Sequence, residues 1–479
     1  MSAAEQTDGH ASPYLGLRPF EAEDASFFFG RHSEVDLLVA NLRTARTSLV
    51  YGQSGVGKSS LLRAGLGPIL DRRSLQHKDN DETGEMLATV VYAMSREDPT
   101  RALSRRIANA AGIDPPREAS VLATIERATE RVDRVLIVLD QFEEYLGYAD
   151  GVDGDSFADD FVRTMTRSEL PVHIMIAIRE DSISKLDRFR PRSQELMSNP
   201  IRIEPLAAAA AREVIDGPIG AYNQLHRTAY RVDDDFASAV IETTGVGMLD
   251  LGVGGRGGLE HRSGAIEAAY LQLVLKSVWE AELQNGSSKM TAKTFEKLGG
   301  VAGIVRKHVD DIMEKFNHDE QVTAAAAFRY LVTPSGMKVP YSSWDLSEMT
   351  HRNAGRIDDV LNRLTSERMR LVRPLTPSPQ GHSRYEIYHD RLADPILDWR
   401  MRFERVGDRS QSFQRASLAV SALTAVLALA TVVAGLRFRL TIEVAAASLL
   451  YALLAFAPLR LRENLSKLLM SDRSVKDDR

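Results

Sequence analysis

The sequence predicts a doubly wound α/β domain with a mostly parallel five-stranded sheet, followed by a helical domain, a winged-helix domain and a transmembrane α-hairpin. Three observations lead to this prediction. Five short apolar runs alternate with helical patterns up to residue 206, the pattern then becomes helical, and two long apolar runs lie near the C-terminus. The chain has 479 residues with 44% hydrophobic content, enough for about three domains with large cores.

The five apolar runs have the length and composition of buried strands. They are Ser48–Tyr51, Met86–Met94, Arg134–Asp140, Val172–Arg179 and Ile201–Leu206. Helical patterns at Asp98–Gly112 and Ala119–Val132 fill two of the gaps between them. Strands that alternate with helices in this way favour a parallel sheet with crossover helices on both faces.

The first strand runs directly into a phosphate-binding loop pattern, Gly52-x-x-x-x-Gly57-Lys58-Ser59. The loop comprises Gly52, Gln53, Ser54, Gly55, Val56, Gly57, Lys58, Ser59 and Ser60, and a helix follows it. Glycines let backbone N–H groups curl around a phosphate, Lys58 can reach the β- and γ-phosphates, and the Ser59 hydroxyl can bind Mg²⁺. The sequence therefore predicts a P-loop NTPase with a nucleoside triphosphate and Mg²⁺ as its ligands.

Acidic residues follow the third apolar run, at the place where such a fold needs them. Asp140 ends the strand and is the predicted Walker B aspartate, which holds Mg²⁺ through water. Glu143 and Glu144 come next, and either carboxylate can polarise the attacking water. The sequence does not choose between them, and each is equally consistent with an acidic residue at the start of a helix.

Arg179 ends the fourth apolar run. A residue at the carboxyl end of a parallel strand faces the ligand crevice of an open sheet, so Arg179 is a candidate γ-phosphate sensor. The alternative is an ion pair with Glu180 or Asp181.

Composition excludes several other kinds of chemistry. The net charge of −6 gives no overall electrostatic argument for nucleic acid, and the absence of cysteine excludes disulfides, thiolate zinc sites and cysteine nucleophiles. The N-terminus lacks the apolar segment of a secretory signal, so we expect the first 400 residues to stay in the cytosol.

Two apolar runs near the C-terminus have the length of membrane spans. They are Ala416–Leu436 and Leu440–Leu459, joined by three residues that contain Arg437 and Arg439. Arginines and a lysine flank the pair, which places both termini in the cytosol and the chain in the cytoplasmic membrane as a multi-pass protein. The alternative is a buried hairpin of a soluble domain.

The region between the sheet and these spans divides into two predicted domains. Helical patterns include Ala207–Ile215 and Glu267–Gln284, and the glycine-rich stretch between them is read as a flexible loop rather than a dinucleotide fingerprint. Further on, two helices and two short apolar runs predict a winged helix; these are Gln321–Val332, Asn353–Ser366, Arg370–Leu375 and Tyr385–His389.

The predicted boundaries follow from these patterns. They are a disordered N-terminus at 1–12, a P-loop domain at 13–206, a helical domain at 207–318, a winged helix at 319–400, a linker at 401–415, the two spans at 416–459 and a cytosolic tail at 460–479.

Several motifs together resemble the novel STAND NTPase family, the signal-transduction ATPases with numerous domains. They are Pro13-Tyr-Leu-Gly-Leu-Arg-Pro-Phe20, Phe28-Phe-Gly30-Arg31, the loop Gly52–Ser60, Leu139-Asp-Gln-Phe-Glu-Glu144, Arg179-x-Asp181, Gly217-Pro218, Tyr270–Val274, Leu298–Val301 and Tyr388-His389-Asp390. The resemblance implies an ATP-dependent switch that is closed with ADP and that opens and oligomerises with ATP. That the nucleotide is ATP rather than GTP rests on this resemblance.

The resemblance also implies further site residues. Gly30 and Arg31 would lie near the adenine, Pro218 would pack against the base, and His389 would read the β-phosphate from the winged helix. Many relatives carry C-terminal repeats, and this chain has the two apolar spans instead.

Three functions follow as expectations. The first is a membrane-anchored ATP/ADP switch that acts through its hairpin as a membrane-perturbing antiviral or stress effector, triggered by an unassigned protein or ligand. The second is a tethered scaffold that recruits a cytosolic partner. The third is a winged-helix regulator that binds nucleic acid, suggested by a local basic segment with Arg352, Arg356, Arg363, Arg368, Arg370 and Arg373.

Overall fold

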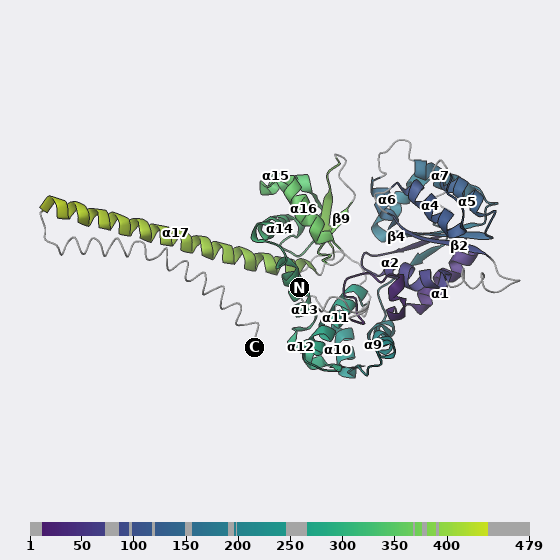
Figure 1. Cartoon of the computed structure of the whole chain (residues 1–479), viewed down its shortest axis with the longest axis horizontal. Coiled ribbons are helices and arrows are strands. Elements are labelled where there is room, and N and C mark those ends of the chain that lie inside the picture. The colour runs from purple at the N-terminus through teal and green to yellow at the C-terminus, as the bar shows by residue number, and fades with distance from the viewer. Residues whose placement is uncertain are drawn as a thin grey trace. The chain divides into compact units, whose positions relative to one another are not determined.

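A computed structural model gives the structure of the chain (Figure 1). It describes residues 12–71, 86–94, 98–116, 120–148, 156–189, 196–197, 199–245, 266–366, 369–375, 381–388 and 392–438. The chain divides into two compact units, Met1–Trp399 and Arg400–Arg479. The glycine-rich stretch lies almost entirely outside the described residues.

A five-stranded parallel sheet forms the centre of the N-terminal part. Its strands are β1 (Thr47–Gly52), β2 (Leu87–Ala93), β3 (Arg134–Asp140), β4 (Val172–Arg179) and β5 (Pro200–Arg202). They lie in the order β2-β3-β4-β1-β5, and every neighbouring pair is parallel. The five predicted strands are therefore confirmed, although β5 is shorter than the run Ile201–Leu206.

Helices cover both faces of this sheet, as the alternation of strands and helices predicts. The elements of this part are η1 (Ala22–Phe27), α1 (His32–Thr44), α2 (Lys58–Ser60), η2 (Leu61–Leu66), α4 (Pro99–Ala111), α5 (Val121–Ala128), α6 (Phe142–Tyr148), α7 (Ser156–Thr166) and η3 (Glu180–Phe189). One apolar cluster joins α4, α5, α6 and α7 to one face, and a second joins α1 and η2 to the other.

Capping residues set the starts of the two predicted crossover helices. The Asp98 carboxylate accepts the N–H groups of Thr100 and Arg101 at the start of α4, and the Ser120 hydroxyl accepts the N–H of Ala123 in α5. These side chains satisfy donors that have no partner inside the helix. Each helix consequently begins within two residues of its predicted start.

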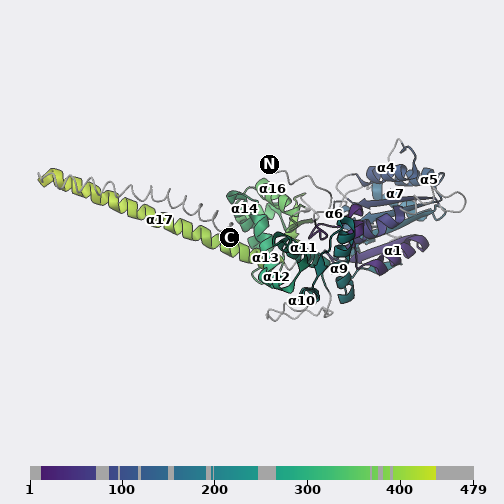
Figure 2. The same cartoon turned by 60° about the horizontal axis from the view of Figure 1, so that its bottom comes forward.

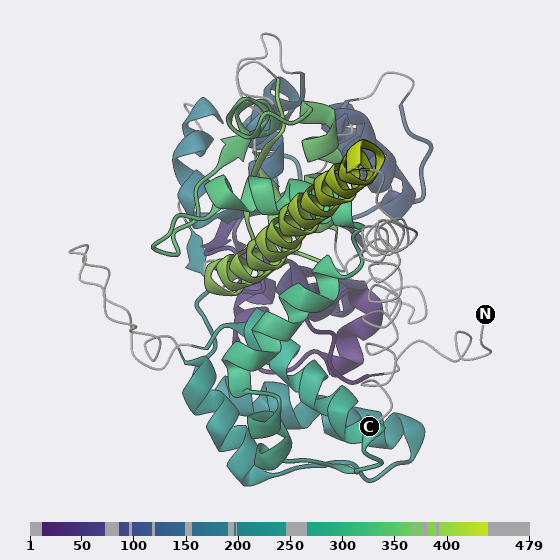
Figure 3. The same ribbon diagram turned by 90° about the vertical axis from the view of Figure 1, so that its left-hand side faces the viewer.

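A second group of helices follows the sheet. It consists of α9 (Ala208–His226), α10 (Asp234–Thr244), α11 (Ala268–Gln284), α12 (Ala292–Lys297) and α13 (Gly300–Met313), with a short parallel pair β6 (Arg231–Val232) and β7 (Lys289–Met290). Figures 2 and 3 show these helices gathered as one teal bundle. The Tyr14 hydroxyl donates to the carbonyl of Ile215 in α9 over 2.6 Å, so the N-terminal segment is fixed to this bundle.

Three helices and a small antiparallel sheet complete the first unit. The helices are α14 (His318–Leu331), α15 (Ser343–Thr350) and α16 (Ala354–Thr365), and β8 (Tyr341–Ser342), β9 (Val372–Leu375) and β10 (Arg384–Ile387) form a sheet in the order β8-β10-β9. We call residues 318–388 the helix–hairpin module. Its order of helices and hairpin is the one expected from the sequence for a winged helix.

Within this module, several of the arginines that suggested nucleic acid contact neighbouring side chains. Arg356 pairs with Asp319, Arg363 with Glu320, and Arg373 with Glu386. Arg352 donates to the hydroxyl of Thr323, and Arg368 lies outside the described residues. The fold thus uses these charges internally.

The last described element is the long helix α17 (Ala393–Phe438). Its first turns belong to the first unit, where Trp399 packs edge-on against Phe328 with ring centroids 6.0 Å apart. Across the residues that the structure describes, no helix combines the length and apolar character needed to cross a membrane. The predicted transmembrane hairpin is therefore not confirmed: Ala416–Leu436 falls within α17, and Leu440–Leu459 lies outside the described residues.

Candidate functional site

The parallel sheet brings three predicted site residues to one edge. Gly52 ends β1 and pairs in register with Arg179 at the end of β4, and Asp140 ends the adjacent strand β3. The carboxyl ends of parallel strands lie at the same edge, where open α/β sheets bind ligands. The strand order therefore explains why residues far apart in the sequence meet here.

The glycine-rich loop has the backbone conformation that its glycines allow. Gly55 and Gly57 have positive φ angles of 81° and 100°, which favour glycine. A Cβ on Gly52 would lie 2.5 Å from the carbonyl oxygen of Ile203, so this position has no room for a side chain. Lys58 begins α2 and donates from Nζ to the carbonyls of Gly52 and Gln53 over 2.9 and 3.0 Å. The loop thus curls around the ammonium group of its own lysine.

Asp140 is almost fully buried, and three hydrogen-bond donors contact its carboxylate. Ser59 donates from Oγ over 3.1 Å, and Gln141 donates its backbone N–H over 2.9 Å. Arg63 donates from Nη2 over 3.1 Å and pairs with Glu21 of the N-terminal segment over 2.6 Å. Gln141 holds a positive φ of 55°, an uncommon and strained conformation for a non-glycine residue.

The two candidate water-polarising carboxylates lie in different environments. Burial raises the pKa of Glu143 to about 7, although the nearby Lys58 ammonium acts in the opposite direction. The Glu143 carboxylate accepts the backbone N–H of Arg179 over 3.2 Å. Glu144 is exposed, and both residues line the same cavity. Burial also lowers the pKa of Lys58, against the attraction of Glu143 and Asp140.

Arg179 forms the ion pair that was the alternative considered from the sequence. Its guanidinium pairs with Asp181, and its Nε is buried without a hydrogen-bond partner among the described residues. The side chain also lines the cavity that contains Lys58. A role as a γ-phosphate sensor stays a prediction.

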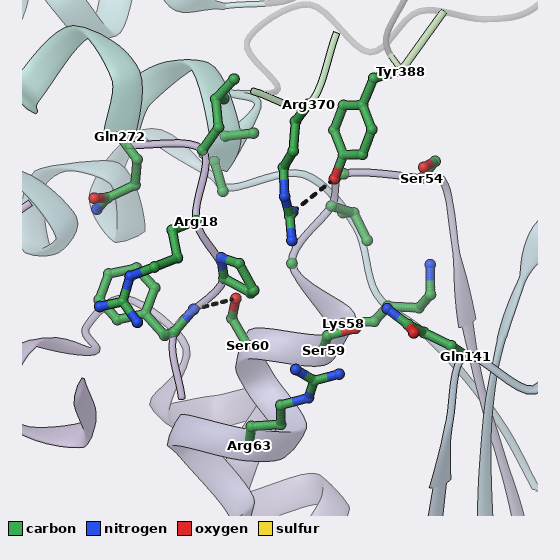
Figure 4. Close-up of a pocket in the computed structure, with 18 of the residues that line it drawn as sticks. Arg18, Ser54, Lys58, Ser59, Ser60, Arg63, Gln141, Gln272, Arg370 and Tyr388 are labelled. Atoms are coloured by element: carbon green, nitrogen blue, oxygen red, sulfur yellow. Dashed lines mark hydrogen bonds between the residues drawn. The ribbon is translucent and has the colours of Figure 1, made fainter. Parts of the chain in front are cut away.

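A cavity of about 510 Å³ lies over the loop (Figure 4). Loop residues Ser54 to Ser60 form its floor, together with Asp140, Gln141, Glu143, Glu144 and Arg179. Apolar and aromatic residues line another part, including Leu17, Phe20, Phe27, Phe28, Phe29, Leu206 and Val214. A cationic region beside an apolar one suits a ligand that joins a phosphate chain to a flat base.

Gly30 and Arg31, which the family resemblance places near the adenine, make structural contacts beside this cavity. Gly30 has a φ of 79°, and a Cβ there would lie 2.6 Å from the carbonyl oxygen of Ala210 in α9. Arg31 lines the cavity and donates to the carbonyls of Val56 and Glu204 over 3.2 and 2.8 Å, which braces the loop.

Two further assignments from the resemblance are Pro218 and His389. Pro218 is buried inside α9 and does not line the cavity, whereas Val214, one turn earlier, does. His389 lies outside the described residues.

Sequence reasoning missed several residues that line the cavity. Arg63 lies four residues after Ser59, and this spacing places both on one face of a helix, so Arg63 could have been found. Gln272 of α11, whose amide oxygen accepts the N–H of Leu15, carries no such signal. Arg370 and Tyr388 also line the cavity, from segments about 300 residues away in the sequence from the loop. Figure 4 shows all four side chains around the loop.

The residues present fit a nucleotide and a magnesium ion. The loop offers backbone donors at a helix start, and Ser59 with Asp140 supplies the hydroxyl and carboxylate oxygens that Mg²⁺ prefers. Among the described residues, no group of three or more His, Cys, Asp or Glu could hold a metal ion. Mg²⁺ here would therefore take its other ligands from phosphate and water, as is usual in P-loop sites.

Comparison with known proteins provides the family. Similar solved structures include an Aeropyrum pernix ORC1 protein in complex with DNA (17% identity, TM-score 0.43, 78% of this chain and 93% of that one). An Aeropyrum pernix ORC2 protein with ADPNP and ADP is also similar (13% identity, TM-score 0.41, 79% of this chain and 95% of that one). So is a Walker-type ATPase of Pyrococcus abyssi (15% identity, TM-score 0.37, 80% of this chain and 99% of that one). No curated protein matches the chain. The family model of Novel STAND NTPase 1 matches residues 13–421, most of the sequence. The chain is therefore a P-loop NTPase that belongs to the novel STAND NTPase 1 family.

Proposed function

We propose that this chain is an ATP/ADP switch that hydrolyses ATP slowly and changes its assembly state with the nucleotide. The observation that carries the proposal is the composition of the cavity. Its floor is the phosphate-binding loop, and its walls include Gln272 of α11 and Arg370 and Tyr388 of the helix–hairpin module. One ligand would therefore touch three parts of the first unit, so that loss of its γ-phosphate alters contacts between them.

The chemistry would divide among the residues at the sheet edge. Lys58 would bind the β- and γ-phosphates in place of the loop carbonyls that it contacts here. Ser59 and Asp140 would hold Mg²⁺, which neutralises charge on the phosphates. Glu143 would polarise the attacking water, because its desolvated carboxylate accepts a proton near neutral pH. Arg179 would meet the γ-phosphate.

Binding and turnover test this proposal directly. The full-length chain is titrated with fluorescent ATP and ADP, and phosphate release is followed in Mg²⁺. Lys58→Ala should lose nucleotide affinity, whereas Glu143→Gln should keep affinity and lose turnover. Lys293→Ala, an exposed lysine of α12, is the matched control and should behave as the wild type. Equal turnover in wild type and Lys58→Ala would contradict the proposal.

A further part of the proposal concerns the membrane. The described side chains of α17 between residues 420 and 433 include six exposed large apolar residues: Val420, Leu423, Val426, Leu427, Leu429 and Val433. Exposed apolar groups of this number mark contact with protein or lipid. We propose lipid, because residues 416–459 contain only Arg437, Arg439 and Glu443 as charged groups. The NTPase part and both termini would then lie on the cytosolic side of the cytoplasmic membrane.

Liposomes distinguish a membrane effector from a tethered scaffold. Flotation with vesicles tests attachment, and dye release tests perturbation, each with ATP, with ADP and with Lys58→Ala. Attachment with ATP-dependent release would support a membrane-perturbing effector, suited to an antiviral or stress response. Attachment without release would support a scaffold that recruits a cytosolic partner. Failure to float with vesicles would contradict the membrane part of the proposal.

A further inference from the structure

Two arginines of the helix–hairpin module line the cavity over the phosphate-binding loop. Arg373 lies in β9, and Arg370 lies two residues before that strand. The other cations that line the cavity include Lys58 of the loop and Arg179 at the end of β4. Arg370 and Arg373 thus contribute positive charge from this module to the cavity over the phosphate-binding loop.

Arg373 has a buried donor that the protein does not use. The residue is 8% exposed, and its Nε and Nη2 donate to Oε2 of Glu386 over 3.2 and 2.8 Å. Its Nη1 has no hydrogen-bond partner among the described residues. A buried N–H of a charged group without an acceptor is costly, and a bound anion would satisfy it.

The carboxylate that holds Arg373 does not neutralise it. Glu386 also pairs through Oε1 with Nζ of Lys338 over 3.1 Å, so one negative charge faces two positive charges. The pair of Glu386 and Arg373 is therefore part of a cluster with net positive charge.

Arg370 combines an unfavourable backbone conformation with contacts to Tyr388. Its φ of 46° lies in the left-handed region, which non-glycine residues seldom adopt. Its Nη1 donates to the Tyr388 hydroxyl over 3.0 Å, and its guanidinium lies 5.6 Å from the centre of the Tyr388 ring. In Figure 4 the side chain extends toward the loop that carries Ser59.

Charges from the sheet domain face this module. Burial acts to raise the pKa of Asp181, but the positive charges of Arg179 and Arg373 help to hold this pKa below its ordinary value. Around Arg373 the charges are thus Asp181 and Glu386 against Arg179, Arg370, Arg373 and Lys338. Among all residues that line the cavity, three are acidic (Asp140, Glu143 and Glu144) and seven are Arg or Lys (Arg18, Arg31, Lys58, Arg63, Arg179, Arg370 and Arg373). The excess of positive charge fits a polyanionic ligand.

We propose that Arg370 and Arg373 bind the phosphate chain of the nucleotide held by the loop. This inference rests on the proposed function, because it assigns the same ligand. It makes residues 370–373 the phosphate contact of the helix–hairpin module, with Tyr388 and Glu386 as the residues that position the two guanidinium groups. Bound nucleotide would then connect this module to the sheet domain.

The test uses the full-length chain with ATP, ADP and AMP as probes. Arg370→Gln should lower ATP affinity about tenfold, and the double variant with Arg373→Gln should lower it further, because each lost contact is a charge-assisted hydrogen bond. The loss should be smaller for AMP, which lacks the phosphate chain. Arg356→Gln is the matched control, since this exposed arginine of the same module pairs with Asp319 away from the cavity.

Hydrogen exchange provides a second measurement that does not depend on affinity. At saturating ATP, residues 370–388 should be protected in wild type and Arg356→Gln but not in Arg370→Gln, which keeps the Glu386 ion pairs and should fold. Wild-type affinity and protection in both arginine variants would overturn the inference and leave the proposed function intact. Failure of the wild type to bind any nucleotide would instead overturn the proposed function itself.

Discussion

Arg63 donates a hydrogen bond to the buried carboxylate of Asp140 over 3.1 Å. The same guanidinium pairs with Glu21, which precedes η1 in the N-terminal segment. The backbone N–H of Phe20 donates to the Ser60 hydroxyl over 3.1 Å, so a second contact fixes this segment beside the loop. Arg63 thereby links the Asp140 carboxylate to the N-terminal segment, so we expect a change at the proposed Mg²⁺ site to reach this segment through Arg63.

Replacing Arg63 with Gln should destabilise the fold in the absence of metal. Asp140 would keep its hydrogen bonds from Ser59 and Gln141. It would lose the hydrogen bond from Arg63, whose guanidinium is the cation that contacts it directly. We expect the free energy of unfolding to fall by about 2 kcal/mol in EDTA. Urea denaturation measures this, with Arg101→Gln on the exposed side of α4 as the control. Equal stability of Arg63→Gln and Arg101→Gln would show that Asp140 does not depend on Arg63.

Glu143 should make stability depend on pH in a defined window. Burial raises its pKa from 4.5 to about 7 in the folded chain, so between these values the folded chain holds more protons than the unfolded chain. Wild-type stability from this group therefore falls as pH rises from about 4.5 to about 7. Glu143→Gln cannot titrate, so its stability relative to wild type should rise across this window and stay constant above it. Denaturation at several pH values measures the difference, and a constant difference would contradict the shift.

The same carboxylate should control the rate of hydrolysis. A water-polarising base must be deprotonated, so kcat/KM should increase as pH rises through about 7 and then reach a plateau. Glu144→Gln, at the exposed neighbouring position, should keep this profile with nearly wild-type rates. If Glu144→Gln lost turnover and Glu143→Gln hydrolysed ATP at the wild-type rate, Glu144 would be the water-polarising base instead of Glu143.

Arg179→Gln should impair hydrolysis more than binding. The γ-phosphate carries developing charge in the transition state, so loss of a nearby guanidinium should reduce kcat by about 100-fold. Affinity for ADP, which has no γ-phosphate, should change little. Single-turnover hydrolysis and ADP titration separate the two effects. An equal loss of ADP affinity would show that Arg179 serves binding, or the local ion pair with Asp181, rather than the chemical step.

A matched pair of glycines in α9 tests how this helix shapes the cavity. A Cβ on Gly217 would lie 2.5 Å from the Phe29 ring, which lines the cavity, whereas a Cβ on Gly220 would meet nothing within 4 Å. Gly217→Ala should therefore displace Phe29 and weaken nucleotide binding. Gly220→Ala should leave binding unchanged and stabilise the helix by about 0.5–1 kcal/mol. Identical nucleotide affinities in the two variants would exclude a contribution of Phe29 packing.

Local patterns were sufficient to predict the sheet domain. The loop glycines, Lys58 and Ser59 are adjacent in sequence, and Asp140 and Arg179 are marked by the ends of apolar runs. Parallel strands then place these residues at one edge. Helices α4 and α5 were predictable because Asp98 and Ser120 cap them.

The remaining site residues depend on tertiary packing that no local pattern contains. Arg370 lines the cavity only through the tertiary arrangement of the first unit, far along the sequence from the loop. The apolar run from Ile201 to Leu206 predicted a strand of that length, whereas pairing with β1 ends at Arg202. The hydropathy of the C-terminal runs predicted membrane spans, and the described helices do not confirm them.

We propose above that nucleotide state controls the assembly of this NTPase. Light scattering of the full-length chain in detergent, with ATP, with ADP and without nucleotide, tests it most directly, using wild type, Lys58→Ala and Glu143→Gln. We expect larger particles for wild type only with ATP, persistent large particles for Glu143→Gln with ATP, and no change for Lys58→Ala. Particles of one size under all conditions, in a wild type that binds ATP, would contradict it.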